Sequence, residues 1–407
     1  MATGTQELGQ LLPVDGVRIA AVSAGIRYRD RLDLVLFELA EGSVSAGVYT
    51  RNAFCAAPVV LARKHVQACA GAVRYLLVNT GNANAGTGAQ GMHDAVECCR
   101  KLAGLADTDI AQVLPFSTGV IGERLPAEKI VAALPGAIDA LVADNWLNAA
   151  KGIMTTDTRP KGMSAVVEHE GQRITITGIT KGAGMIKPDM ATMLAFVATD
   201  AQIAQPLLHD MLRSAVEYSF NRITVDGDTS TNDCCVLTAT GRSGVTIDIS
   251  DSELYEKFNT ALHDLIVQLA KLIIRDAEGA RKFVTVDVRG GADSRECLMV
   301  AYAIAESPLV KTALSASDPN WGRILAAVGR AGLDDLVVDK IDIYLDDVII
   351  VQQGGLAPSY TEAQGQRVMN QEDITLRIEL GRGDVTEQVW TADLSEEYVR
   401  INASYRS

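Results

Sequence analysis

Strand-forming runs recur along the whole chain and mix irregularly with helical segments, and this mixture limits the folds that the chain can adopt. The runs are rich in Val, Ile, Leu and Thr, the residues that sheets prefer. They cover residues 32–39, 73–79, 172–180, 192–199, 233–240, 282–290 and 340–351. Because few of them form regularly spaced strand–helix–strand units, we expect a layered α/β or α+β fold rather than a barrel.

Apolar residues repeat with helical spacing in four further segments, which cover residues 93–106, 127–143, 206–221 and 253–276. An apolar face of this kind usually packs on a sheet or on another helix. The pattern is clearest in the last segment, where one stripe is formed by Leu262, Leu265, Ile266, Leu269, Leu272 and Ile273.

Composition excludes several classes of protein. At 407 residues the chain has room for two or three domains, and its net charge of -14 argues against a nucleic-acid-binding surface. Charges interrupt every apolar stretch well before the ~20 residues of a membrane span. Residues 1–25 show no basic region followed by an apolar one. Seven cysteines, including the adjacent pairs Cys98–Cys99 and Cys234–Cys235, do not suggest a disulfide framework. We therefore expect a cytoplasmic protein that binds neither nucleic acid nor a membrane.

Gly86, Gly88 and Gly91 match the G-x-G-x-x-G pattern of dinucleotide-binding turns. That turn must begin where a strand ends, but the sequence NTGNANA (79–85) separates the strand from Gly86. A backbone-rich loop near a pocket therefore fits better than a dinucleotide-dependent oxidoreductase.

Metal sites and serine-hydrolase sites lack their usual residues. The five histidines include no pair at i, i+4, and the sequence contains neither C-x-x-C nor G-x-S-x-G. We expect no metal site, and a nucleophile in this chain needs an activator other than histidine.

The segment KGAGMIKPDMATMLAFVATD (181–200) offers such an activator. A Thr hydroxyl becomes nucleophilic when a base takes its proton, and the α-amine of an N-terminal Thr, with a pKa of about 7.7–8.0, is one such base. Breaking the Ala191–Thr192 bond would create that amine. Gly182 and Gly184 permit unusual backbone angles before the bond, and Pro188 stiffens the approach. From the residues alone, an ordinary strand Thr remains the alternative.

The same segment resembles the self-cleavage region of the ornithine acetyltransferase (glutamate N-acetyltransferase) family of arginine biosynthesis, in which K-G-x-G-M and A-T-M-L are hallmarks. Other blocks resemble that family in the same order, so the resemblance covers essentially the whole chain. These blocks are NTGNANAGTG (79–88), STGVIGE (117–123), MTTDTRPK (154–161), TVDGDTSTND (224–233), RDAEGA (275–280), DPNWGRI (318–324) and NASYRS (402–407).

The resemblance implies catalytic roles for three residues and a cleavage site. Thr192 is the implied nucleophile, freed by cleavage after Ala191. Thr118 and Gly119 are the implied oxyanion hole, in which a hydroxyl and a backbone N–H would hold the oxygen of the tetrahedral intermediate. A helix cap or turn is the structural alternative for this Ser-Thr-Gly block.

The resemblance also implies a set of substrate-binding residues. Lys181 suits the α-carboxylate of an amino acid and Glu278 suits the side-chain ammonium of ornithine, although these pairings can be exchanged. The block 224–233 receives no role. The full implied set is Thr155, Lys181, Thr192, Glu278, Asn402 and Ser407.

The implied fold is the layered α/β sandwich that this family shares with self-processing aminopeptidases. Cleavage would give fragments 1–191 and 192–407, which fold together and assemble as two copies of each. The implied reaction is ping-pong transfer of the acetyl group of N2-acetyl-L-ornithine to L-glutamate, without a cofactor. Acetyl-CoA is a second donor in bifunctional members, and the sequence gives no physical basis for choosing between the two types. A hydrolase that uses the same Thr is the alternative activity.

Overall fold

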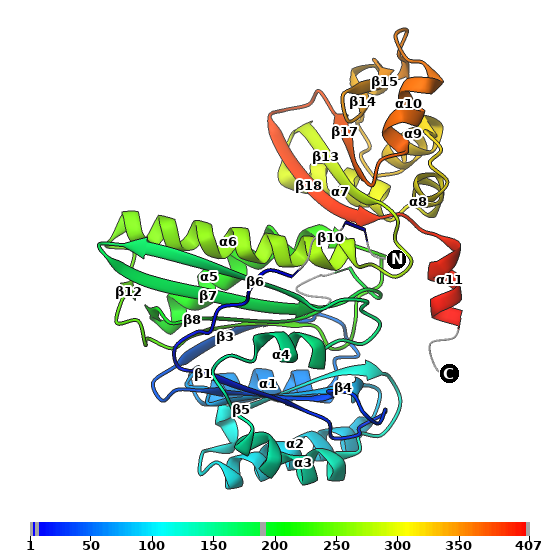
Figure 1. The fold of residues 1–407 in the computed structure, drawn as a ribbon. Helices are drawn as coiled ribbons and strands as arrows, with labels where there is room; N and C mark the ends of the chain where they lie inside the picture. Colours follow the sequence, from blue (N-terminus) through cyan, green and yellow to red (C-terminus); the bar gives the residue numbers. More distant parts are fainter. Residues whose placement is uncertain (1–2, 5–7, 188–192, 404–407) are drawn as a thin grey trace. The chain divides into compact units, whose positions relative to one another are not determined.

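The computed structural model describes residues 3–4, 8–187 and 193–403 (Figure 1). Contacts divide the chain into two compact units. Unit 1 consists of Met1–Gln6, Arg222–Asp228 and Ile274–Ser407, and unit 2 consists of Glu7–Asn221 and Thr229–Ile273. The expected fragments 1–191 and 192–407 therefore do not coincide with the units, because unit 2 contains residues from both sides of residue 191.

Unit 2 is built on two facing sheets. One has the order β1-β2-β4-β5, with β1 (Val17–Val22), β2 (Leu34–Leu39), β4 (Tyr75–Asn82) and β5 (Val113–Val120). The other has the order β3-β11-β8-β7-β6, with β3 (Val44–Tyr49), β11 (Cys234–Ala239), β8 (Leu194–Thr199), β7 (Gln172–Lys181) and β6 (Lys161–His169). A small parallel pair is formed by β9 (Gln202–Ile203) and β12 (Thr246–Ile247).

Aromatic side chains join the two sheets. The ring of Phe196 on β8 lies 5.3 Å from that of Phe37 on β2 and 5.1 Å from that of Phe116 on β5. All three residues are fully buried. Burying each such side chain stabilises the fold by about 1.5–3 kcal/mol. The two sheets therefore form one hydrophobic core between them.

Helices cover the outer faces of both sheets, so unit 2 has four layers (Figure 1). On the first sheet, α2 (Gly88–Leu105) and α3 (Ala127–Asp139) bury apolar side chains against it. On the second lie α5 (Gln205–Glu217) and α6 (Ser252–Arg275), and Leu265 and Leu269 of α6 contact Gly178 of β7. The helices α1 (Ala57–Ala68) and α4 (Trp146–Gly152) contribute to the core between the sheets. This is a layered α/β sandwich, as expected.

Unit 1 has one seven-stranded sheet with the order β10-β18-β13-β17-β14-β15-β16 and its own core. Its strands are β10 (Ile223–Thr224), β13 (Phe283–Gly291), β14 (Asp342–Leu345), β15 (Val348–Gln352), β16 (Gly355–Leu356), β17 (Asp373–Glu379) and β18 (Val385–Ala392). Its helices are α7 (Ser294–Ala305), α8 (Pro308–Ser315), α9 (Trp321–Gly329), α10 (Glu362–Met369) and α11 (Glu396–Ala403).

The strand-like run 340–351 is not one strand, which corrects the sequence-based expectation. It forms β14 and β15, which pair antiparallel through a turn at residues 346–347. Asp346 adopts a φ of 49°, a left-handed conformation that Asp tolerates better than most residues. Each of the other six runs overlaps one observed strand, and the four helical segments overlap α2, α3, α5 and α6.

Three further observations concern the described residues. No single helix among them is long and apolar enough to span a membrane. Only the pair α7 and α8, which is bent by 56°, reaches the length and composition of a membrane span when the two helices are taken together. No cluster of three or more His, Cys, Asp or Glu within the described ranges could hold a metal ion. All seven cysteines are free thiols.

Candidate active site

Sequence blocks that are far apart along the chain meet in unit 2. The amide Nδ2 of Asn232 donates to the carbonyl of Ala83 at 2.6 Å and to that of Ser117 at 2.9 Å. The hydroxyl of Thr229 donates to the carbonyl of Lys187 at 2.9 Å. Residues 229–233 therefore connect the blocks around residues 79–88, 117–123 and 181–187. The sequence had suggested no role for this segment.

Lys181 links two of the predicted site residues. It ends β7 and is 9% exposed. Its ammonium donates to the hydroxyl of Thr155 at 2.7 Å and to that of Thr118 at 3.1 Å. Because the Thr118 oxygen accepts from a cation, its own hydrogen remains available to donate, and the adjacent positive charge makes it a stronger donor.

Gly119 occupies a position that only glycine fits. Its φ is 135°, and a Cβ there would lie 2.3 Å from the carbonyl carbon of Gly81. The pairing between β4 and β5 shifts register at Gly81 and Asn82. The backbone after Thr118 thus packs directly on the backbone of β4, which holds it in one conformation. A preorganised oxyanion hole requires such a fixed backbone.

Asp157 organises this cluster, although the sequence analysis did not select it. Its carboxylate is fully buried and accepts hydrogen bonds from Lys161 Nζ at 2.5 Å, Gly182 N at 2.7 Å and Thr155 N at 2.9 Å. Burial alone would raise the pKa of Asp157, but the ammonium groups of Lys161 and Lys181 hold it well below its usual value. Asp157 therefore positions both Thr155 and the glycine that follows Lys181. The block MTTDTRPK (154–161), which contains Asp157, was the feature of the sequence that could have identified this residue.

Asp233 is a second buried acid that the sequence analysis missed. It precedes β11, and the N–H of the next residue, Cys234, donates to the carbonyl of Met193 at 2.8 Å. Its Oδ2 forms no hydrogen bond with any residue that the structure describes. Burial raises the pKa of Asp233 well above its usual value, despite hydrogen bonds from Ser230 and the charge of Lys181. The neutral acid is therefore favoured.

These protonation states decide the charge of the cluster. Asp157 and Lys161 offset each other, and the raised pKa of Asp233 favours its uncharged form. Lys181 then leaves the cluster with an excess of positive charge, which suits a substrate carboxylate or a developing oxyanion.

A second cluster of predicted residues lies in unit 1. Asn402 Nδ2 on α11 donates to Glu278 Oε2 at 2.7 Å, and Glu278 is buried. The hydroxyl of Tyr398, also on α11, donates to Asp226 Oδ2 at 3.0 Å. Burial and the charge of Asp226 raise the pKa of Tyr398, so the phenol stays a donor. Tyr398 thus connects the helix that carries Asn402 to residues 222–228.

The predicted site residues divide into three groups. Unit 2 brings Thr118, Gly119, Thr155 and Lys181 together, and unit 1 brings Glu278 and Asn402 together. The remaining residues, Ala191, Thr192 and Ser407, lie outside the described residues.

Gly86, Gly88 and Gly91 lie in a closely packed turn at the start of α2. Thr87 donates to Asn84 Oδ1 at 2.8 Å, and Asn84 Nδ2 donates to the carbonyl of Gly91 at 2.8 Å. A Cβ on Gly91 would lie 1.8 Å from Thr87 Oγ1. Close packing thus explains the glycine at position 91.

Comparisons with known proteins agree with each other. A model of the ArgJ family matches residues 18–407. The chain is 57% identical over 408 residues to the arginine biosynthesis bifunctional protein ArgJ of Pseudomonas fluorescens (strain Pf0-1), covering 100% of both chains. It is 54% identical over 409 residues to the protein of that name from Psychrobacter arcticus, again covering 100% of both.

Two solved structures are also similar. The arginine biosynthesis bifunctional protein of Bacillus halodurans is 38% identical, with a TM-score of 0.49, and the match covers 52% of this chain and 98% of that one. The ornithine acetyltransferase of Mycobacterium tuberculosis complexed with ornithine is 33% identical, with a TM-score of 0.38, and the match covers 44% of this chain and 94% of that one.

Proposed function

Because this chain belongs to the ArgJ family, we propose that it transfers the acetyl group of N2-acetyl-L-ornithine to L-glutamate in arginine biosynthesis. One observation carries the proposal beyond the family assignment. Lys181 holds the hydroxyls of Thr118 and Thr155 in one buried, positively charged cluster. Such a cluster suits acyl transfer, in which negative charge develops on a carbonyl oxygen.

In the proposed reaction, the Thr192 hydroxyl first attacks the carbonyl of Ala191 and displaces its own amide nitrogen, and water then hydrolyses the resulting ester to leave a carboxylate on Ala191. The new α-amine of Thr192 takes the proton of its own hydroxyl, and Oγ attacks the acetyl carbonyl of acetylornithine. Thr118 and the backbone N–H of Gly119 stabilise the oxyanion. The C–N bond then breaks, ornithine leaves with the proton on its amine, and an acetyl ester remains on Thr192. The amine of glutamate attacks this ester and regenerates the Thr hydroxyl.

The substrate contacts are part of the same proposal. Lys181 is assigned to the α-carboxylate that both amino acids share, which the positive charge of its cluster supports. Glu278 is assigned to the side-chain ammonium of ornithine, and Asn402 holds the carboxylate of Glu278 in place. Thr155 and the terminal Ser407 complete the set.

Three finer points extend the proposal. Acetyl-CoA acts as a second donor to glutamate, in keeping with the word bifunctional in the names of the relatives. The fragments 1–191 and 192–407 stay together and assemble as two copies of each. The enzyme works in the cytoplasm, where its seven free thiols would remain reduced.

A denaturing gel with N-terminal sequencing tests the cleavage. The purified protein should give two bands, one of which begins Thr-Met-Leu. Thr192→Ala should give one band and no transfer. Thr246→Ala, the same change at an exposed Thr of unit 2, should behave like the wild type. An active sample with an uncut chain would overturn the mechanism.

A partition assay separates the transferase from a hydrolase that uses the same Thr. Acetylornithine is supplied with and without glutamate, and ornithine release is measured. Release that depends on glutamate supports the transferase, whereas equal release without glutamate identifies a hydrolase. Acetylglutamate formation from acetyl-CoA and glutamate alone tests the second donor.

A further inference from the structure

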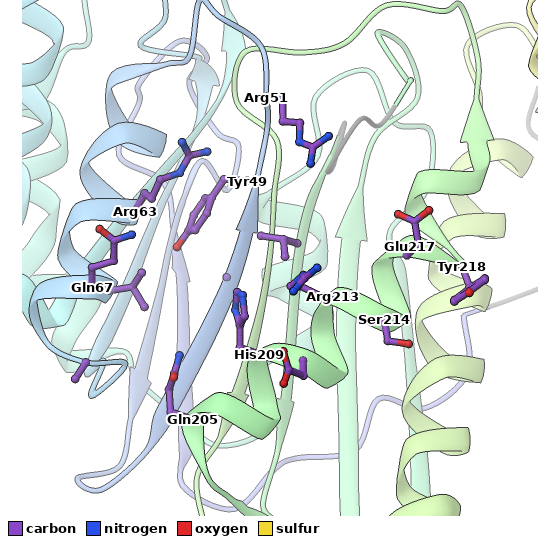
Figure 2. Close-up of a pocket in the computed structure, with 15 residues that line it drawn as sticks. Tyr49, Arg51, Arg63, Gln67, Gln205, His209, Arg213, Ser214, Glu217 and Tyr218 are labelled. Carbon is purple, nitrogen blue, oxygen red and sulfur yellow. The ribbon is translucent and has the colours of Figure 1, made fainter. Parts of the chain in front are cut away.

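A cleft of about 1240 Å³ lies beside β3 in unit 2, between α1 and α5 (Figure 2). Arg63 and Gln67 project from α1, His209 and Arg213 project from α5, and Tyr49 of β3 lies between them. None of these five residues belongs to the clusters that hold Lys181 or Glu278. The proposed acetyl transfer therefore does not account for the chemistry of this cleft.

Positive charge gathers in the cleft although the whole chain carries a net charge of -14. Three guanidinium groups line it, those of Arg51, Arg63 and Arg213, against the two carboxylates of Asp210 and Glu217. The carboxylate of Glu217 already accepts a hydrogen bond from Asn221 at 2.9 Å. The cleft is thus locally cationic on a protein that otherwise repels anions.

Arg213 has donors without a partner among the described residues. It follows Asp210 by three residues and precedes Glu217 by four on α5, spacings at which helical ion pairs commonly form. Even so, its side chain forms no hydrogen bond or ion pair within the described part of the chain, and neither does that of His209. Both side chains instead project from α5 on the side of the cleft (Figure 2).

The opposite wall is held in a fixed arrangement. Arg63 Nη2 donates to the carbonyl of Thr50 at 3.1 Å, and the guanidinium lies 5.5 Å from the centre of the Tyr49 ring. Tyr49 is 7% exposed, and its hydroxyl has no partner among the described residues. A buried donor without an acceptor costs free energy, and an anionic oxygen entering the cleft would supply that acceptor.

The length of the cleft indicates the size of its ligand. Lining residues follow α5 from Gln205 to Glu217, and the 13 residues of this helix span about 20 Å. Tyr49 pairs with Cys234, and Cys234 pairs with Leu194. The C-terminal end of β3 therefore lies at the same end of the sheet as the start of β8. A single amino acid is too short to occupy this distance.

We propose that the cleft binds an elongated organic phosphate, with its phosphate groups on Arg63, Arg213 and His209. Guanidinium groups match phosphate oxygens with two parallel hydrogen bonds, and an imidazole N–H adds a second type of donor. The inference uses none of the residues assigned to acetyl transfer, so either proposal can fail without the other.

Calorimetric titration of the full protein tests the site, with pyrophosphate, ADP and coenzyme A as probes. All three should bind and compete with one another. Arg213→Ala and Arg63→Ala should each weaken binding by about tenfold or more, because each removes a charge-assisted contact. Arg100→Ala provides the matched control, since Arg100 is an exposed arginine of unit 2 that pairs with Glu97 on α2.

The outcomes are distinct. Tighter binding of coenzyme A than of ADP would identify the ligand as a thioester donor, and equal binding would identify a nucleotide effector; both support the site. Arg213→Ala should retain acetyl transfer from acetylornithine, which shows that the variant is folded. No phosphate binding at millimolar concentration, equal binding of citrate, or unchanged affinity in both arginine variants would overturn the proposal.

Discussion

Replacing Asp157 with Asn should damage both the stability of unit 2 and the candidate site. Lys161 is 1% exposed, and the change removes the carboxylate charge that faces its ammonium at 2.5 Å. Removing one partner of a buried ion pair costs about 3–5 kcal/mol. One of the two backbone N–H groups of Thr155 and Gly182 also loses its acceptor, because each uses a different carboxylate oxygen and an Asn side chain has only one oxygen.

This free energy corresponds to a large change in melting temperature. A loss of 1 kcal/mol lowers the Tm by about 2–4 °C in a domain of 150–250 residues. Asp157→Asn should therefore lower the Tm by on the order of 10 °C at pH 7, measured by differential scanning fluorimetry. The rates of chain cleavage and acetyl transfer should fall as well, measured at a temperature at which the variant is folded.

The pH dependence follows from the direction of the pKa shift. Because the pKa of folded Asp157 lies below that of the unfolded chain, its contribution to stability is present above about pH 4 and is lost as the pH falls further. The difference in Tm between the wild type and Asp157→Asn should therefore shrink in acid.

A double variant checks the reasoning. Asp157→Leu combined with Lys161→Met should melt above Asp157→Asn, because it removes the ammonium of Lys161 that Asp157→Asn leaves buried without its counter-charge. A Tm for Asp157→Asn within about 2 °C of the wild type at pH 7 would refute the argument, since it would mean that this buried pair contributes under 1 kcal/mol.

Variants at three other positions test the two clusters of the candidate site and the buried Lys311 of α8. Thr118→Ala should lower kcat by about 10²–10³, the usual effect of losing one oxyanion donor, whereas Thr118→Ser should retain most of it. Tyr398→Phe removes the hydrogen bond to Asp226 and should raise the KM for acetylornithine a few-fold, as expected for about 0.5–1.5 kcal/mol, with kcat little changed. Burial lowers the pKa of Lys311 to about 8, so the unfolded chain holds this proton more tightly. Wild-type stability relative to Lys311→Met should therefore rise between about pH 8 and 10.4, measured by urea unfolding.

Elements with a long, regular pattern were predictable from the sequence. The 24 residues of α6 match the predicted segment 253–276 to within one residue at each end, because six apolar residues keep one helical face. The buried strand β8 likewise lies within the predicted run 192–199. The hairpin of β14 and β15 was not predictable, because it depends on a two-residue turn of aspartates inside an otherwise strand-like run.

The candidate site was only partly predictable, for a different reason. Thr118, Thr155 and Lys181 were selected by resemblance, but the contacts between them join residues 26 and 63 positions apart. Asp157 and Asp233 were missed because an aspartate in a polar segment is typical of an exposed turn. Only the fold shows that both are buried, and that Lys161 and Lys181 lower the pKa of Asp157 whereas burial raises that of Asp233.

The sheet explains why a break after Ala191 is compatible with a folded chain. The strands on either side, β7 and β8, are antiparallel neighbours, and Lys181 pairs with Leu194. β8 also pairs with β11 on its other side, where the N–H of Cys234 binds the carbonyl of Met193. A cut between the two strands therefore removes no pair of the sheet. After such a cut, Thr192 would be the first residue of the second fragment and would be joined directly to Met193, which this hydrogen bond holds to β11.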